Sequence, residues 1–259
     1  MKTPLKDNLN FKSLNFIKKL IPQNSTVSSF LLYSGILDCG LAADNRYVTS
    51  HTEKYCIYEF WNCVLDDPKK VAGLATTIYN RLTKVPAIQL GRLIETLQGG
   101  VEDNSDDYYV RAAYFFLLNQ ISDCGSVSSG TTDLRKFNPV SLHTLQNFKI
   151  NNFHLSYEEG EDFLETLKKQ ESDFLLLPVG NYSRNLFERG TNKGWETTTI
   201  YHSKLFDSIA STDTKWVTIY KKHLDIFDIY KDYNLFMVDK RGRQTIKKNN
   251  CEDIIIANF

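Results

Sequence analysis

The sequence predicts an α/β protein in which a mostly parallel sheet carries helices on both faces and ends in an antiparallel hairpin. Residues 174–177 are four consecutive apolar residues that lead into Pro178-Val179-Gly180, a pattern typical of a strand buried on both faces. Amphipathic segments with helical spacing alternate with such short apolar runs, which favours parallel strands joined by helices. Two apolar runs close together near the C-terminus predict the hairpin.

Each strand is expected where a short apolar run is bounded by turn residues. The expected strands are residues 27–32, 46–50, 152–155, 174–177, 216–220, 235–238 and 254–258. Helices are expected where apolar residues recur every three or four positions. The expected helices are residues 11–21, 36–43, 54–65, 68–84, 88–97, 108–120, 141–148, 157–170, 198–210 and 225–232.

Turn and loop residues divide these elements. Pro68 suits the first turn of a helix, and Gly99-Gly100 is expected to end the helix before it. Residues 122–133 are rich in Ser, Thr and Gly, and they are expected to form a mobile loop or insertion. Asp38 and Asp44 flank a helix and are expected at the surface.

The composition is that of a globular protein. Of the 259 residues, 42% are hydrophobic and 24% are charged, which is ordinary for a soluble fold. Lys and Arg together number 31, as do Asp and Glu, so no global field draws the protein to nucleic acid or to a membrane. Any such attraction must come from a local patch.

The cysteines and histidines point to a reduced protein without a metal centre. None of the five cysteines has CxxC spacing, so free thiols in a reducing compartment are expected. The five histidines show no HxxxH or HxH spacing, so no metal site is expected. No signal peptide and no membrane-length apolar run is found. We therefore expect a cytoplasmic protein, in the host cytoplasm or a virion if it is viral, with no membrane partner.

Several segments match, in order, the motifs of one family. Lys12 corresponds to a lysine that precedes the family's first helix, and residues 27–35 fall at its acidic-Pro-Phe-x-Gly-x-Gly strand and loop. Residues 50–61 fall at an Asn-Asp pair followed by a helix, and Arg111-Ala112-Ala113 through Asn119 is similar to an Arg-Ala helix that ends in Asn. Residues 136–139 fall at a Gly-x-Phe-Asn-x-Pro segment, and residues 202–206 match the segment before the closing hairpin. In this order the chain resembles the Dam-type DNA adenine methyltransferases, from about Phe11 to Phe259.

The resemblance implies a fold, a domain plan and a cofactor site. The fold would be a Rossmann-like methyltransferase sheet forming one domain over residues 1–259. Residues 66–150 would be a small helical insertion that corresponds to the family's DNA-recognition region. The family's cofactor is S-adenosylmethionine, and the positions that match its binding residues are Lys12, Phe30, Ser34, Gly35 and Thr52.

The chain departs from the family where the chemistry is done. Leu32 and Tyr33 fall where the family has glycines beside the cofactor, and Ser28 and Thr52 replace its two acidic residues. Bulky side chains at the glycine positions are expected to fill cofactor space. We therefore expect no bound cofactor, with S-adenosylmethionine only if the chain is an enzyme.

The catalytic motif is altered as well. The family's Asp-Pro-Pro-Tyr motif holds the target amine with its carboxylate and stacks the flipped base on its ring. That motif falls on Leu177, Pro178, Val179 and Gly180, so neither group remains. Tyr182 is the candidate substitute for the ring, and no catalytic residue is expected.

The leading hypothesis is thus a catalytically inactive Dam-like homologue that acts as a nucleic-acid-binding or protein-scaffold component. Frequent Asn, Lys, Tyr and Phe indicate an AT-rich genome, and a phage source is the expectation. The alternatives are a divergent S-adenosylmethionine-dependent DNA adenine methyltransferase and a structural subunit of a larger viral assembly. Candidate phosphate contacts, should DNA be the partner, are Arg135, Lys136, Arg184, Arg189, Lys193, Arg241, Arg243, Lys247 and Lys248.

Overall fold

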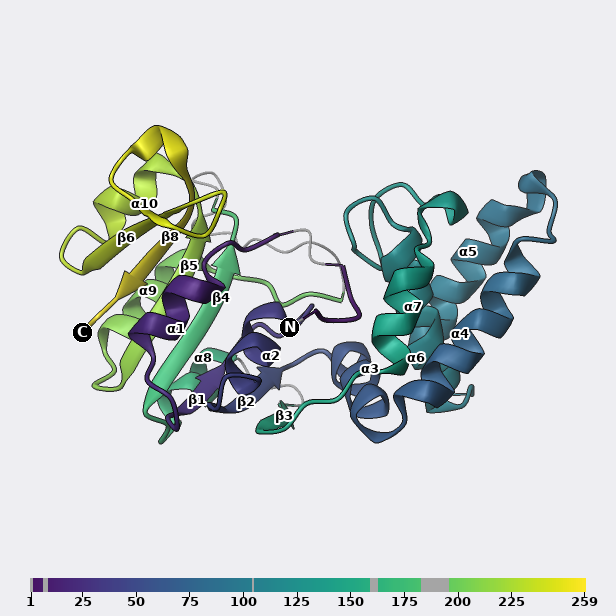
Figure 1. Ribbon diagram of the computed structural model, residues 1–259, viewed down its shortest axis with the longest axis horizontal. Coiled ribbons are helices and arrows are strands. Elements are labelled where there is room, and N and C mark those ends of the chain that lie inside the picture. Colours follow the sequence, from purple (N-terminus) through teal and green to yellow (C-terminus); the bar gives the residue numbers. More distant parts are fainter. Residues whose placement is uncertain (1, 7–8, 104, 159–162, 183–195) are drawn as a thin grey trace.

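One sheet organises the described part of the chain, which comprises residues 2–6, 9–103, 105–158, 163–182 and 196–259 of a computed structural model (Figure 1). Its strands run in the order β3-β2-β1-β4-β5-β8-β6-β7. They are β1 (Thr26–Ser29), β2 (Tyr47–Thr52), β3 (Phe153–Tyr157), β4 (Phe174–Gly180), β5 (Lys215–Lys221), β6 (Asn234–Asp239), β7 (Gln244–Thr245) and β8 (Cys251–Ala257).

The direction of the strands confirms the predicted fold class. Strands β3, β2, β1, β4 and β5 are parallel to one another, whereas β8 is antiparallel to both β5 and β6. The first three strands run outward from β1, and the chain then returns to place β4 on the other side of β1. This reversal between β1 and β4 is the switch point at which Rossmann-like sheets open a ligand crevice.

Helices cover both faces of the sheet, and others form a separate bundle beside it (Figure 1). The helices next to the sheet are α1 (Leu14–Leu20), α2 (Ile36–Ala42), α3 (Tyr55–Asp66), α8 (Phe163–Lys168), α9 (His202–Ala210) and α10 (Leu224–Ile229). Between β2 and β3 the chain forms α4 (Pro68–Leu82), α5 (Ala87–Glu102), α6 (Tyr108–Ile121), the short 3₁₀ helix η1 (Leu134–Lys136) and α7 (Pro139–Gln146). Among the described residues, no helix combines the length and the apolar character that crossing a membrane needs.

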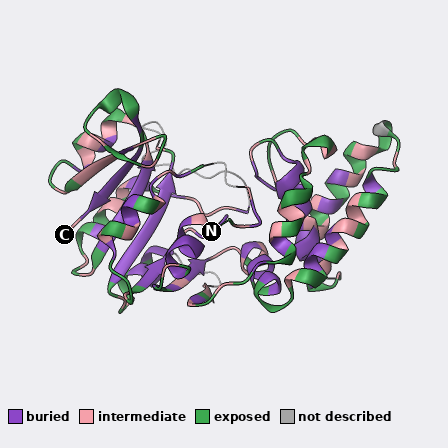
Figure 2. Ribbon diagram, viewed as in Figure 1, coloured by how far each residue is buried: buried purple, intermediate pink, exposed green. Residues whose placement is uncertain are grey.

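The core lies in two apolar clusters, one on each face of the sheet. Because successive strand side chains point to opposite faces, Leu176 joins the cluster beneath α1 and α2, whereas Leu175 and Leu177 join the cluster beneath α8 and α9. All seven residues of β4 are buried, as expected of a central strand (Figure 2). The central strand was therefore correctly located from its unbroken apolar run.

A buried ion pair connects the helical bundle to α3, one of the helices next to the sheet. Arg111 of α6 donates from Nε to Oε2 of Glu59 on α3 at 2.7 Å, and its second terminal nitrogen contacts the other oxygen of the same carboxylate. The same guanidinium donates to the carbonyl of Asp106 at 2.7 Å. Both charges are nearly buried, so removing one partner would leave the other uncompensated.

Some element boundaries differ from the predictions. Helix α5 continues through Gly99-Gly100 to Glu102 because Leu97 and Val101 both pack into the core, and tertiary packing outweighs the low helix propensity of glycine. The expected helix over residues 157–170 is reduced to α8, since Tyr157 still belongs to β3. Its residues 159–162 lie outside the described part.

Candidate ligand cavity at the switch point

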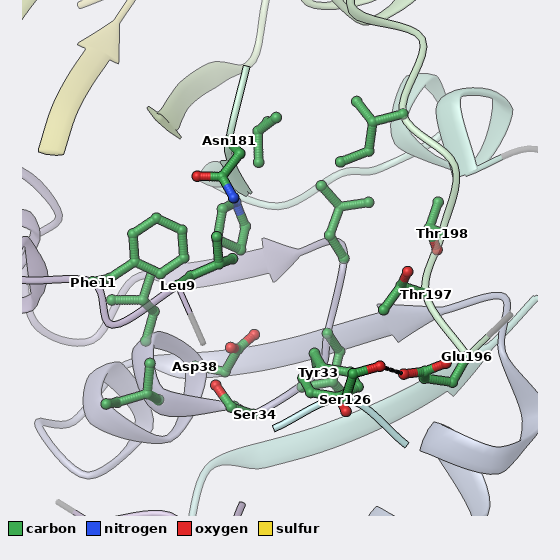
Figure 3. Close-up of a pocket in the computed structure, with 18 residues that line it drawn as sticks. Leu9, Phe11, Tyr33, Ser34, Asp38, Ser126, Asn181, Glu196, Thr197 and Thr198 are labelled. Carbon is green, nitrogen blue, oxygen red and sulfur yellow. Dashed lines mark hydrogen bonds between the residues drawn. The ribbon is translucent and has the colours of Figure 1, made fainter. Parts of the chain in front are cut away.

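A cavity of about 190 Å³ opens beyond the carboxyl ends of β1 and β4 (Figure 3). Four parts of the chain enclose it: the segment from Leu31 to Asp38, the end of β4, the N-terminal segment, and the stretch that leads to α9. The lining residues from these parts, with Ser126, are Leu9, Phe11, Leu31, Leu32, Tyr33, Ser34, Gly35, Ile36, Leu37, Asp38, Pro178, Val179, Asn181, Glu196, Thr197, Thr198 and Ile200.

The loop after β1 is held by the indole of Trp61. Trp61 Nε1 donates to the Tyr33 carbonyl at 2.9 Å. Gly35 has φ +65°, and a Cβ there would lie only 2.7 Å from Cζ2 of Trp61, so this position excludes a side chain. Gly35 thus lets the chain turn sharply into α2 with the indole packed against it.

Tyr33 forms a wall of the cavity. Its hydroxyl donates to the Gly125 carbonyl at 2.6 Å and its ring packs near Phe115 of α6. Burial, helped by the nearby charge of Glu196, raises the pKa of Tyr33 well above its ordinary value. The side chain is directed toward the helical bundle, and open space remains beside it and Leu32.

The end of β4 contributes apolar groups and one amide to the cavity. The pairing of β4 with β5 shifts register between Leu177 and Gly180, and this irregularity accommodates Pro178, which has no N–H for the ladder. Pro178, Val179 and Asn181 line the cavity. The Leu177 side chain instead joins the cluster on the α8–α9 face, and its carbonyl accepts from the Thr218 hydroxyl at 3.1 Å.

Neighbouring side chains pack closely against Gly180 and Tyr182. Gly180 has φ +83°, and any Cβ added there would overlap the Leu9 side chain, which lies across the strand end. Tyr182 packs against the rings of His202 and His223, at centroid distances of 5.1 and 4.7 Å. The candidate substitute ring is thus on the aromatic cluster beside α9 and does not line the cavity.

Asp38 is a cavity residue, and the expectation that it lies at the surface was wrong. Its side chain, on α2, is only 3% exposed, and the Ser50 hydroxyl donates to it at 2.8 Å. Burial raises its pKa, and the hydrogen bond from the Ser50 hydroxyl partly opposes that rise. The prediction failed because α2 is short and buried on every side from Leu37 to Ala42, so it has no polar face on which Asp38 could lie.

Glu196 fixes the loop that was expected to be mobile. Its buried carboxylate accepts from the Val127 N–H at 2.9 Å and from the hydroxyls of Ser126 and Ser128. A backbone bridge between Ser122 and Thr132 closes the same loop. No local signal in the sequence could have identified this contact, because the partners are about 70 residues apart in the chain.

The structure brings together only some of the residues that match the family's cofactor positions. Ser34 and Gly35 line the cavity, whereas Lys12, Phe30 and Thr52 do not. The Phe30 ring is buried and stacks on His51 at 4.6 Å, and Thr52 Oγ1 accepts from the Lys54 N–H at 3.1 Å. Ser28, at the family's first acidic position, donates to Gln170 at 3.0 Å.

The candidate phosphate contacts that lie in the described part form two separate groups. Arg135 and Lys136 are exposed on η1, where Arg135 pairs with Asp133 at 2.9 Å. The second group is exposed around the β6–β7 hairpin at the sheet's edge, away from the helical bundle (Figure 1). Its members are Arg241, Arg243, Lys247 and Lys248. Arg184, Arg189 and Lys193 fall outside the described residues.

Neither a search for metal ligands nor comparison with known proteins identifies a ligand for this site. Within the described ranges, no group of three or more His, Cys, Asp or Glu side chains is arranged to hold a metal ion. Comparison with known proteins found no family model that matches the chain and no match among curated sequences. The site must therefore be interpreted from its own geometry.

Proposed function

We propose that this chain is a Dam-type methyltransferase homologue that has lost catalysis and acts as a nucleic-acid-binding or protein-scaffold component. The observation that carries the proposal is the end of β4. Methyl transfer to an adenine amine needs an acceptor for that amine and an aromatic ring for the extruded base. The Leu177 side chain is apolar and packs away from the cavity, and Gly180 has no ring and lies under Leu9.

The cavity wall also lacks the groups that the family uses for S-adenosylmethionine. Thr52, at the position of the acid that binds ribose, lies outside the cavity lining. Leu32 and Tyr33 stand at the glycine positions and line the cavity, so a cofactor could not approach the backbone there as closely as it can beside glycine. The residues present do not fit this cofactor.

The position of the basic residues bears on the partner. If the partner is nucleic acid, phosphate contacts from the β6–β7 hairpin would give sequence-tolerant binding that weakens steeply with salt. The test is fluorescence anisotropy with labelled duplex DNA at low and at physiological salt, comparing the unaltered protein with an Arg241→Glu, Arg243→Glu variant. Salt-dependent binding that the variant loses would support nucleic acid as the partner. Equally weak binding by the two proteins would count against nucleic acid and favour a protein partner.

Calorimetry with S-adenosylmethionine tests the loss of the cofactor directly. We expect no heat of binding at millimolar ligand. A micromolar Kd would overturn the proposal, provided that the heat disappears in Asn181→Trp, where a large ring on an exposed lining residue should block the cavity. Binding that persists in this variant would lie elsewhere and leave the proposal standing.

A further inference from the structure

The Asp38 carboxylate faces the cavity without a positive partner. Across the described residues, no lysine, arginine or histidine forms an ion pair with it. In Figure 3 its oxygens are directed into the open space on the side of Leu9. A buried carboxylate without a positive partner is costly, and a cation that enters the cavity would offset that cost.

The second acid of the cavity is not available for such a role. Glu196 already accepts from the backbone N–H of Val127 and from the hydroxyls of Ser126 and Ser128. These donors satisfy both of its oxygens. Asp38 is therefore the acidic group that a ligand would contact. Ser34, Asn181 and Thr198 add neutral polar groups to the cavity lining.

The remaining wall is apolar and sets the size of the ligand. Leu9, Phe11, Leu37, Val179 and Ile200 contribute hydrocarbon surface. The volume of about 190 Å³ slightly exceeds that of an engineered apolar cavity of about 150 Å³ that admits benzene. A ligand with one ring and a short polar substituent fits this space.

We propose that the cavity binds a small primary amine with an apolar, ring-sized body, and that its ammonium group lies against Asp38. The inference rests on the proposed function, because it requires a cavity that S-adenosylmethionine does not occupy. The carboxylate of this site lies on α2, at a different place from the family's two acidic positions, which here are Ser28 and Thr52. Apolar walls with one convergent charged group are typical of small-molecule sites.

The test is calorimetry at neutral pH with benzylamine and with benzyl alcohol, which has the same ring without the charge. Benzylamine should bind more tightly by about tenfold or more, as expected for a hydrogen bond to a charged group. Asp38→Asn should remove this difference. Equal affinities of the unaltered protein for the two ligands would contradict the proposal, and this comparison needs no variant.

Two controls separate this result from the fate of the proposed function. Asn181→Trp keeps Asp38 and should abolish binding of both ligands; retained binding would place the amine outside the cavity and overturn the inference. Competition with S-adenosylmethionine is the second control. If that cofactor displaces benzylamine, the loss of cofactor binding in the proposed function is refuted, and if neither benzylamine nor the cofactor binds, the amine site fails alone.

Discussion

Replacing Leu177 by Asp, the residue at this place in the catalytic motif that the chain resembles, should unfold the protein. The Leu177 side chain is 0% exposed within the apolar cluster of Leu175 and Trp216. Losing the buried leucine costs about 2–3 kcal/mol. The new carboxylate would meet only hydrocarbon, and raising its pKa by 3–5 units until it is neutral costs a further ~4–7 kcal/mol. The sum is comparable with the roughly 5–15 kcal/mol that stabilises a whole domain.

Urea unfolding followed by tryptophan fluorescence measures this effect, since Trp61 and Trp216 are both fully buried. Leu177→Met is the matched control, because a volume-conserving change in a core costs under about 1.5 kcal/mol. We expect the Met variant to unfold close to the unaltered protein and the Asp variant to be largely unfolded without urea. An Asp variant as stable as the Met variant would refute the assignment of Leu177 to the core, since the carboxylate would then have to reach water or the cavity.

Three further outcomes follow from the same contacts. Gly180→Ala should lower the free energy of unfolding in urea by about 2 kcal/mol or more, because an L-residue is strained at φ +83°, and adding Leu9→Ala should restore only the part of that loss caused by overlap with Leu9. Burial lowers the pKa of His202 to about 4, against 6.5 in an unfolded chain, so the unfolded state binds more protons between these values. Stability should therefore fall as pH drops from 6.5 to 4, and His202→Gln should flatten that fall in urea midpoints measured across the range. Glu196→Ala should cost about 2–3 kcal/mol and open the 122–132 loop to protease; unchanged cleavage there would rule out the carboxylate as its anchor.

Short-range patterns were sufficient to predict the sheet and most of its helices. An unbroken apolar run located β4, and Pro68 correctly marked the start of α4 with Asp67 as its N-terminal cap. The continuation of α5 past Gly99-Gly100 was not predicted, because it depends on packing against α6, a helix that follows later in the chain. Where packing partners are local the pattern is informative, and where they are distant it is not.

The cavity was only half predictable for the same reason. Its position beyond β4 follows from the alternation of strands and helices, and Ser34 and Gly35 were expected there. Asp38 was not, because burial on all sides of a short helix leaves no amphipathic pattern. The orientation of Tyr182 depends on the register shift after Leu177 and on contacts with His202, neither of which the sequence displays.

Transfer of a labelled methyl group from S-adenosylmethionine to adenine-rich duplex DNA tests the central claim most directly. One missing preorganised contact in such a site costs roughly a hundredfold or more in rate, and Leu177 and Gly180 supply neither the carboxylate nor the ring of the catalytic motif that the chain resembles. The account predicts that the purified, unaltered protein incorporates no label above a control without protein. Incorporation above that control, lost in the cavity-blocking Asn181→Trp variant, would show that the chain is an active methyltransferase and would contradict the account.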